Sequence, residues 1–231
     1  MQNVSKTLCS CLAVLLCFAT QLASAQELNQ IYVSSGSDIS SFSFLTDQKI
    51  VIRISTDGKL LEYGTDPGTG RYNYYSGKLQ PFMGRIDYYP PTERDSLLRG
   101  KVRSIGSCMI TYYGAYEQAS RAGRIRSLGS LQFDYVGVEN MYNQGKLKSI
   151  GYTQVDFYAG SENEAFRGKL KTIGNTSVTW YSSFEDKSIR GKIKSIGSYS
   201  YAWYASYDRG YGGMKSGSPM QNVNGVTFLV R

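Results

Sequence analysis

A seven-residue segment occurs five times in this chain of 231 residues, and it constrains the fold more than any other feature. Each copy reads Gly, basic, apolar, basic, Ser or Thr, Ile or Leu, Gly, and successive copies begin 23, 22, 23 and 23 residues apart. Degenerate copies begin at Gly77 and Gly213. A fixed period of this length is typical of chains that stack one small structural unit. The full copies are Gly100–Gly106, Gly123–Gly129, Gly145–Gly151, Gly168–Gly174 and Gly191–Gly197.

The remainder of each unit has the alternation of a half-buried strand. In one unit Val178 and Trp180 are two residues apart and Tyr181 follows them, and the other units have a similar pattern. Apolar residues at every second position predict a strand with one buried face. Each unit holds two such strands and therefore predicts a β-hairpin. The second Gly supplies the positive φ that a tight turn requires.

The register of the hairpin is predicted from its faces, because residues opposite one another point to the same side of a sheet. A three-residue turn starting at the second Gly places Leu147 opposite Phe157 on the apolar face. On the other face it places Lys148 opposite Asp156. The same register pairs Leu170 with Trp180 and Arg126 with Asp134.

The chain outside the full copies also has β patterns. The run Ile50–Ser55, Asp57-Gly58 and Lys59–Tyr63 predicts a hairpin, and Val226–Val230 predicts a closing strand. We expect an all-β fold, an antiparallel meander of tandem β-hairpin repeats that is elongated or curled into a barrel-like shell. The expected segments are an irregular β region with the first degenerate repeat at 26–99, five tandem hairpin repeats at 100–212, and a degenerate capping hairpin at 213–231, with 26–231 as one structural domain.

The first 25 residues have the features of a secretory signal peptide. Lys6 precedes an apolar run from Leu8 to Ala19, and Ala23-Ser24-Ala25 is a small-x-small cleavage pattern. We expect cleavage near Ala25 and a secreted, periplasmic or cell-surface protein. No later stretch is apolar enough for a transmembrane helix in the mature chain. Cys108 is the one cysteine that remains, so no internal disulfide is expected.

The charged and titratable residues limit the classes of function. The chain has no histidine, which excludes Ser-His-Asp and Cys-His catalysis and His-ligated metals. After removal of Lys6 the mature chain has 25 basic and 18 acidic residues, a net charge of +7. This charge favours anionic partners such as an acidic polysaccharide or the cell-envelope surface. Nucleic acid is not an expected partner of an exported protein, and no cofactor or metal is expected.

The hairpin unit resembles the tandem β-hairpin repeats of exported bacterial proteins. The period near 23 and the aromatic-x-Gly entries Tyr75-Ser-Gly77 and Phe166-Arg-Gly168 are similar to arrays of the MORN kind, and Tyr207-Asp208 is similar to arrays of the tyrosine-aspartate (YD) kind. The resemblance covers residues 77–217. It implies an elongated or curled antiparallel sheet, and it carries over no catalytic residue.

The basic residues at positions two and four of each unit are the candidate binding residues. By the alternation they lie on one face, beside a tyrosine from each second strand. Cations interleaved with aromatic rings suit an anionic polymer. The alternative interpretation of the same residues is a solvated outer face that the lysines keep soluble. The candidate ligand-binding residues are Arg103, Arg126, Lys146, Lys148, Lys169, Lys171, Lys192, Lys194, Tyr113, Tyr158, Tyr181 and Tyr204.

The opposite face carries the aliphatic and aromatic residues of each unit. Its ordinary role is a hydrophobic core. The alternative is a groove in which sugars stack on Trp180, Trp203 and Tyr112. A single-layer sheet would expose these residues, so we expect the sheet to curl or to pack on the N-terminal hairpins.

Two further classes of function stay open as alternatives. A carboxylate-dependent glycan hydrolase needs two acids roughly 5–10 Å apart, and Glu162 with Glu164 or Glu185 with Asp186 are close enough in sequence. An outer-membrane β-barrel needs strands of about 9–11 residues with an uncharged lipid face, whereas the first strand of each unit is shorter. The favoured interpretation is a non-enzymatic exported protein with a structural or ligand-binding role and no catalytic residues.

Overall fold

The computed structural model describes residues 26–67 and 78–231, and all regular secondary structure in these ranges is β. The all-β prediction is confirmed. In the described ranges no helix is long and apolar enough to cross a bilayer. The predicted signal segment at 1–25 and the degenerate copy beginning at Gly77 lie outside or at the edge of the described residues.

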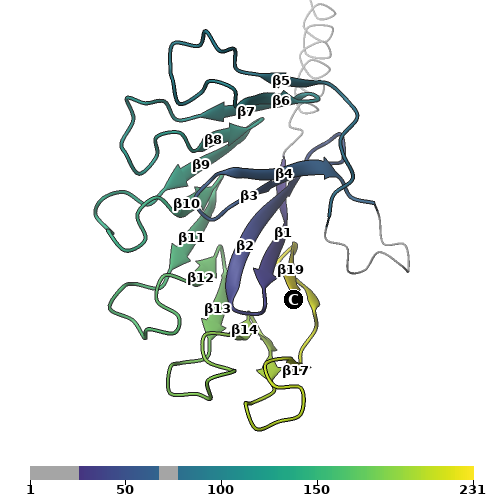
Figure 1. Cartoon of the computed structure of the whole chain (residues 1–231), viewed down its shortest axis with the longest axis vertical. Helices are drawn as coiled ribbons and strands as arrows, with labels where there is room; N and C mark the ends of the chain where they lie inside the picture. The colour runs from purple at the N-terminus through teal and green to yellow at the C-terminus, as the bar shows by residue number, and fades with distance from the viewer. Residues whose placement is uncertain (1–25, 68–77) are drawn as a thin grey trace, which may run out of the picture.

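Two sheets make up most of the protein (Figure 1). One has eleven strands in the order β15-β14-β13-β12-β11-β10-β9-β8-β7-β6-β5, and the other has six in the order β18-β19-β1-β2-β3-β4. We call them the hairpin sheet and the terminal sheet. The strands of the hairpin sheet are β5 Ile86–Tyr88, β6 Val102–Ile105, β7 Cys108–Tyr112, β8 Ile125–Leu128, β9 Leu131–Tyr135, β10 Leu147–Ile150, β11 Thr153–Phe157, β12 Leu170–Ile173, β13 Thr176–Trp180, β14 Ile193–Ile196 and β15 Tyr199–Ser200. A separate pair is β16 Ala202–Trp203 with β17 Met214–Ser216.

The turns of the hairpin sheet are one residue shorter than the sequence predicted. Ile150 pairs with Thr153, so the turn contains only Gly151 and Tyr152. Gly151 has a φ of +57°, whereas Tyr152 is not among the residues of positive φ. Positive φ at the first turn residue alone is the pattern of a type II′ turn, which matches the twist of the flanking strands. The predicted three-residue turn is therefore wrong.

The apolar residues that were predicted to pair within a hairpin pair instead with residues of a neighbouring hairpin. Leu170 is opposite Phe157 of the preceding hairpin, and Thr172 is opposite Asp156. Lys171 is the extra residue of a β-bulge between these two pairs. The predicted pairs Leu147–Phe157, Leu170–Trp180, Lys148–Asp156 and Arg126–Asp134 are not register partners. An alternating pattern identifies a face of a strand, but it does not say which neighbouring strand lies beside it.

The terminal sheet brings the two ends of the described chain together. Its strands are β1 Glu27–Ser34, β2 Asp38–Leu45, β3 Ile50–Ile54, β4 Leu60–Thr65, β18 Met220–Val223 and β19 Val226–Val230. The predicted N-terminal hairpin is present as β3 and β4, and the predicted closing strand as β19. β19 pairs parallel to β1, which also pairs with β2. Both edges of β1 are thus covered, which removes an aggregation-prone strand edge.

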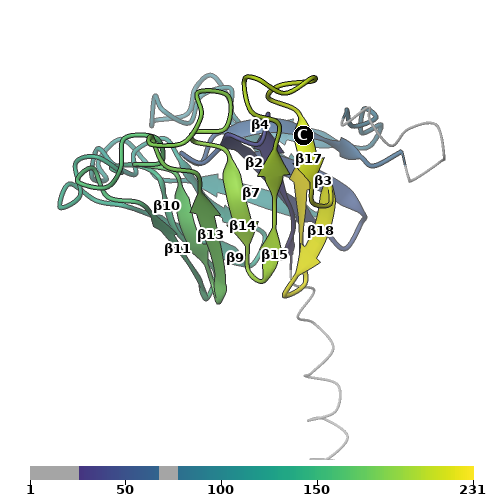
Figure 2. The ribbon, with the colours of Figure 1, turned by 90° about the horizontal axis from the view of Figure 1, so that it is seen from below.

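The hydrophobic core lies between the two sheets (Figure 2). Phe44 of the terminal sheet meets Phe133 of the hairpin sheet edge to face, with ring centroids 5.2 Å apart. Each sheet buries one apolar face against the other, so the hairpin sheet has a covered inner face without closing. In the described residues the hairpin sheet ends at β5 and β15, and no closed barrel forms.

Turns of the terminal sheet also bond to the first strands of the hairpins. The amide of Ile125 donates to Gly58 O at 3.1 Å, that of Leu147 to Thr56 O at 2.8 Å, and that of Ile193 to Gly36 O at 2.7 Å. These contacts place the turns of the terminal sheet beside the position-two cations of the recurring segments.

Candidate functional site

The ten cations of the recurring segments form two separate rows rather than one face. We call the position-two cations the inner row and the position-four cations the outer row. The inner row is half-buried, whereas every member of the outer row is exposed. The inner row is Lys101, Arg124, Lys146, Lys169 and Lys192, and the outer row is Arg103, Arg126, Lys148, Lys171 and Lys194.

Each inner-row cation lies over an aromatic ring of its own hairpin. Lys192 Nζ is 4.3 Å from the ring centroid of Trp203, and Lys169 Nζ is 4.8 Å from that of Trp180. Contacts of this length are cation–π interactions. The other three pairs are Lys101 with Tyr112, Arg124 with Tyr135 and Lys146 with Phe157.

The inner-row cations also donate hydrogen bonds to backbone carbonyls. Lys192 Nζ donates to Gly212 O at 2.8 Å and to Ser35 O at 3.1 Å, and Lys169 Nζ donates to the carbonyls of Gly191 and Ser37. Lys101 and Lys146 likewise bond to the Gly that begins the next segment. Burial lowers the pKa of all four lysines. Three predicted ligand-binding residues, Lys146, Lys169 and Lys192, are therefore engaged inside the protein.

The start of the strand explains why simple alternation misplaced the inner row. Lys169 precedes the first residue of β12, where the chain is still leaving the loop. Lys171 is the bulged residue, and it shares one face with Thr172 because both oppose Asp156. Because Lys169 is outside the strand, the alternation along β12 does not assign it to the face of Lys171.

The outer row lies over tyrosine rings of the preceding hairpin. Lys171 Nζ is 5.4 Å from the ring centroid of Tyr158, and Lys194 Nζ is 5.6 Å from that of Tyr181. Arg126 is 5.6 Å from Tyr113, and Arg103 is 5.9 Å from Tyr89. Lys148 has no such ring because Val136 stands at the equivalent position. Tyr204 ends the series, with Lys215 Nζ 5.8 Å from its ring.

The outer tyrosines are fixed by their hydroxyl groups. Tyr113 donates to Phe133 O at 2.8 Å, Tyr158 to Val178 O at 3.1 Å and Tyr181 to Tyr201 O at 2.9 Å. Each bond reaches a residue 20 positions later, so it ties one hairpin to the next. Burial raises the pKa of these three hydroxyls. The structure thus brings the outer row and its tyrosines together as the sequence predicted.

Acidic residues near the outer row are concentrated toward one end of the sheet. Asp134 forms an ion pair with Arg121 at 2.9 Å, and Asp156 accepts a hydrogen bond from Thr172. The next two hairpins have Thr179 and Ala202 at the equivalent positions. Toward Lys194 the outer face therefore carries cations with fewer neighbouring carboxylates.

The aromatic residues of the opposite face belong to the core. Trp180 is 4% exposed and Trp203 is 6% exposed. Their indole N–H groups donate to Leu170 O and Ile193 O, each at 2.7 Å. Tyr112 donates to Val102 O at 3.0 Å. The alternative of a sugar-stacking groove on these three rings is wrong, because Trp180 and Trp203 are buried in the core and Tyr112 is half-buried against it with its hydroxyl bonded.

Most of the carboxylates considered for catalysis have partners within the protein. Hydrogen bonds from the hydroxyls of Ser188 and Ser206 hold the pKa of Asp186 well below its usual range. Glu162 lies 3.8 Å from Lys171, and Glu164 lies 3.7 Å from Arg167. Asp186 thereby joins its own loop to the next one, since Ser206 is 20 residues further along the chain.

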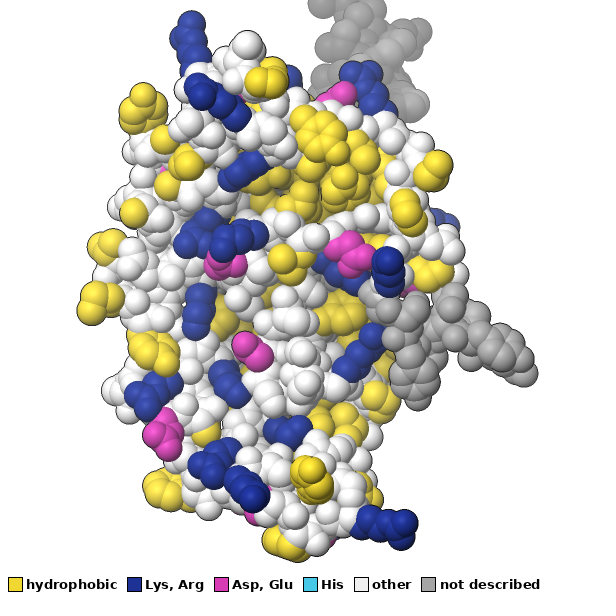
Figure 3. Space-filling view, in the orientation of Figure 1, with side chains coloured by type: hydrophobic (Ala, Val, Ile, Leu, Met, Phe, Trp, Pro, Cys, Tyr) yellow, Lys and Arg dark blue, Asp and Glu magenta, His cyan; other side chains and the backbone are white. Residues whose placement is uncertain are grey.

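Apolar side chains stand along the margin formed by the loops between hairpins, where Figure 3 shows them as separate patches. The residues at equivalent positions of these loops differ in type, and the polar residue Ser161 interrupts the apolar series. Cations and acids both occur nearby in Figure 3, so this margin has no single charge preference. The most exposed apolar residues of these loops are Tyr116, Val138, Met141, Phe184, Tyr207 and Tyr211.

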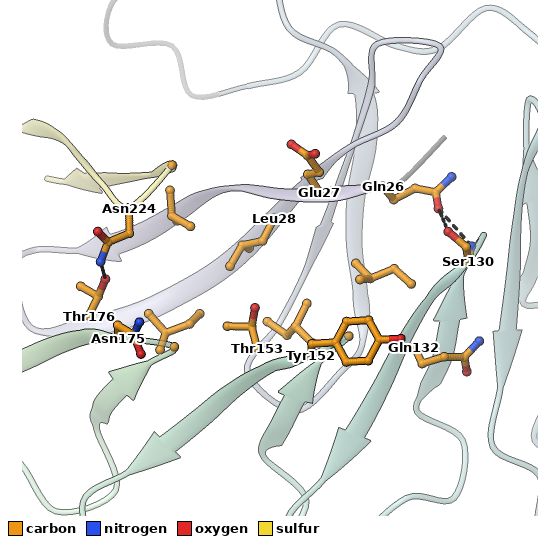
Figure 4. Close-up of a pocket in the computed structure, with 17 residues that line it drawn as sticks. Gln26, Glu27, Leu28, Ser130, Gln132, Tyr152, Thr153, Asn175, Thr176 and Asn224 are labelled. Carbon is orange, nitrogen blue, oxygen red and sulfur yellow. Dashed lines mark hydrogen bonds between the residues drawn. The ribbon is translucent and has the colours of Figure 1, made fainter. Parts of the chain in front are cut away.

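A cleft of about 700 Å³ opens between the sheets where the turns of the hairpin sheet face β1 (Figure 4). Its lining contains amide and hydroxyl side chains above aliphatic ones, and Glu27 is its one charged residue. The repeated pattern made no prediction about this cleft. Its residues follow the turn glycines, where the repeated pattern varies, and their partners at Gln26 and Asn224 are far away in the chain. The polar lining residues are Gln26, Glu27, Ser130, Gln132, Tyr152, Thr153, Asn175, Thr176 and Asn224.

The described residues offer little for metal or thiol chemistry. They contain no group of three or more Cys, Asp and Glu residues placed to hold a metal ion. Cys108 is buried, and this burial raises the pKa of its thiol to about 11. A thiol in this state is a poor nucleophile at neutral pH.

Comparisons of the chain with protein-family models, curated proteins and solved structures found no match, so its function is inferred from the geometry of its own residues.

Proposed function

We propose that this chain is an exported, non-enzymatic tandem β-hairpin repeat protein that binds an anionic polymer of the cell envelope on its outer face. One observation carries the proposal. The outer row presents one exposed cation on each of five successive hairpins, and four of the five lie over a tyrosine ring. Export is supported by the signal-peptide pattern of residues 1–25.

The spacing of the outer row suits a polymer better than a small anion. Each hairpin adds two strands, so successive outer-row cations are about 9–10 Å apart. No two of them are close enough to enclose one phosphate or carboxylate. A chain with charges along its length can contact several cations at once, and each further contact is intramolecular and therefore favoured.

The tyrosines add a preference for a polymer made of rings. Because Tyr113, Tyr158 and Tyr181 are held by their hydroxyl bonds, their rings are already ordered before a ligand binds. A preorganised surface loses less side-chain entropy on binding. Sugar rings can pack on the exposed parts of these rings while acidic substituents contact the cations. An acidic polysaccharide is thus the favoured ligand.

The test compares dextran sulfate with unsulfated dextran as the probe. The triple variant Arg126→Gln, Lys171→Gln, Lys194→Gln should bind dextran sulfate about tenfold more weakly than the parent, since three exposed contacts of modest energy are lost. Raising the salt concentration should weaken binding by the parent more than by this variant. Isothermal titration calorimetry at two salt concentrations measures both effects.

A matched control separates the outer row from net charge. Lys78→Gln, Lys187→Gln, Arg209→Gln also removes three exposed cations, but from other parts of the surface. It should change the affinity for dextran sulfate less than twofold. Equal losses in the two triple variants would show that bulk charge, not the outer row, holds the polymer.

A further inference from the structure

The cleft between the two sheets has a different chemistry from the outer face. It is lined by residues of three successive hairpin turns, together with the start of β1 and the turn between β18 and β19. Figure 4 shows Ser130, Tyr152 and Asn175 in order along one wall, with Leu28 and Asn224 on the other side. Neighbouring turns are about 9–10 Å apart, so the cleft extends along the row of turns. Its volume of about 700 Å³ is in the range of ligand-binding pockets.

No cation lines this cleft, and Glu27 is its single carboxylate. An anionic ligand would therefore contact no basic side chain in the cleft, because the basic residues that give the chain its net charge lie elsewhere. The floor is aliphatic, and the polar groups are primary amides and hydroxyls. Such groups donate and accept hydrogen bonds, and so do the hydroxyl groups of a neutral sugar. The aliphatic residues of the lining are Leu28, Leu131, Ile150, Ile173 and Val226.

Two internal hydrogen-bond contacts hold the ends of the cleft in place (Figure 4). Gln26 Oε1 accepts from the amide of Ser130 at 3.1 Å and from its hydroxyl at 3.3 Å. At the other end, Asn224 Nδ2 donates to Thr176 Oγ1 at 2.9 Å. Each contact joins the terminal sheet to the hairpin sheet. The cleft is thus formed before any ligand enters, which lowers the cost of binding.

Between these two ends the cleft has polar groups that are not used within the protein. Within the described residues, the side chains of Thr153 and Asn175 make no hydrogen bond with another residue. The side chain of Gln132 points away from the cleft, because Gln132 is opposite Ser127 on the outer face of the sheet while its neighbour Phe133 is buried. Tyr152 is fully exposed at the turn between β10 and β11, next to the aliphatic floor. An exposed ring beside an unpaired amide and hydroxyl can pack against the C–H face of a sugar while these two groups bond to its hydroxyls.

We propose that this cleft binds a neutral oligosaccharide, with Tyr152 as the stacking residue and Thr153 and Asn175 as hydrogen-bonding residues. The ligand is a segment of several sugar units, because the lining spans three turns. The site shares no residue with the outer row, so it is independent of polyanion binding. A protein with both sites would hold an acidic and a neutral glycan at two separate surfaces.

The experiment uses the purified protein with a panel of neutral hexasaccharides, namely those of cellulose, xylan, mannan and amylose, and with hexagalacturonate as the acidic probe. At least one neutral hexasaccharide should bind, and hexagalacturonate should not compete for the cleft. Tyr152→Ala should weaken that binding at least tenfold. In the ¹⁵N spectrum of the labelled parent, the side-chain amide signal of Asn175 should shift on titration, whereas that of Gln132 on the outer face should not, and Gln132→Ala and Asn175→Ala identify these signals.

The matched control is Tyr116→Ala, which removes another fully exposed tyrosine outside the cleft. It should leave the neutral hexasaccharide affinity within twofold of the parent, and Tyr152→Ala should leave dextran sulfate binding unchanged. Because Tyr152 is exposed, its variant is expected to melt with the parent. The proposal is overturned if no neutral hexasaccharide binds, if Tyr152→Ala and Tyr116→Ala behave alike, or if the acidic hexasaccharide alone binds through Tyr152. A loss of dextran sulfate binding in the outer-row variant tests the proposed function separately.

Discussion

The inner and outer rows contain the same residue types two positions apart, yet they do different work in the protein. Lys169 lies over the buried ring of Trp180 and bonds to the carbonyls of Ser37 and Gly191. Lys171, two residues later, is exposed over the ring of Tyr158. The difference teaches that a repeated cation is not evidence for a binding face until its hydrogen-bond partners are known.

The hydrogen bonds of the inner row link each hairpin to its neighbours. Lys146 and Lys169 each donate to the Gly that begins the following segment, which lies 22 residues later. Desolvation of a charged amine is costly, and these bonds with the aromatic ring below offset that cost. A basic residue recurs at position two because it bonds to backbone carbonyls of other segments. The residues at position four make no such bond to a backbone carbonyl within the described residues.

The largest difference between the two faces is expected from their aromatic residues. Trp180→Ala should destabilise the protein by about 3–5 kcal/mol, because it empties a core position beneath Lys169. Tyr181→Ala, on the outer face of the same strand end, should cost about 1–2 kcal/mol, since it removes a half-buried ring and one hydrogen bond. Chemical denaturation of the two variants measures the difference. Equal losses would mean that the two faces are not inner and outer.

The pH dependence of stability should report on the burial of the tyrosines and lysines of the inner face. Burial raises the pKa of Tyr112 and Tyr135 above the usual value near 10. Above about pH 10 the unfolded chain loses these protons while the folded protein keeps them, so stability falls as pH rises. The inner-row lysines act in the opposite direction. Their pKa is lowered in the folded protein, so their unfavourable burial is relieved as pH approaches about 10.4.

The predicted outcome is a melting temperature that changes little up to about pH 10 and falls beyond it. Tyr135→Phe should make the fall less steep, because it removes one of the titrating hydroxyls. Thermal melts from about pH 9 to about pH 11 provide the measurement. A melting temperature that keeps rising through this range would contradict the burial of these tyrosines.

The most direct comparison replaces one cation from each row by methionine, which keeps an unbranched side chain. Lys169→Met should cost about 1–3 kcal/mol, because two backbone carbonyls lose a charged donor. Lys171→Met should stay within about 0.5 kcal/mol of the parent. Denaturant titrations of the two variants test this, and dextran sulfate binding should be weakened only by Lys171→Met. The reverse pattern would exchange the roles of the two rows.

The smallest expected effect concerns the glycines that begin the recurring segments, of which Gly191 accepts a bond from Lys169 and, among the described residues, Gly100 accepts none from the inner row. Gly100 and Gly191 have nearly the same φ, +72° and +73°. A Cβ at Gly100 would meet nothing within 4 Å, whereas at Gly191 it would lie 2.9 Å from Ala165 O and 3.0 Å from Lys169 Nζ. Gly100→Ala should therefore show only the backbone cost, about 1 kcal/mol. Gly191→Ala should lose roughly 1 kcal/mol more. Indistinguishable melts would argue against the contact with Lys169.

The sequence alone determined the all-β class, the positions of most strands and the glycines of the turns. Val178, Trp180 and Ile193 were placed on a buried face by their alternation, and the structure buries all three. The outer row and its tyrosines were also identified correctly as neighbours. These features depend on local periodicity and on backbone φ, both of which short stretches of sequence determine.

Only the tertiary structure decided which residues meet across the molecule. The two-residue turn and the bulge at Lys171 set the register, and contact with the terminal sheet leaves Lys169 half-buried while Lys171 is exposed. The cleft has the same origin, since Gln26 and Ser130 are 104 residues apart in the chain. The physical reason is that a strand pattern fixes which side chains share a face. What covers that face depends on segments that are far away in the chain, and the local periodicity of the strand gives no information about them.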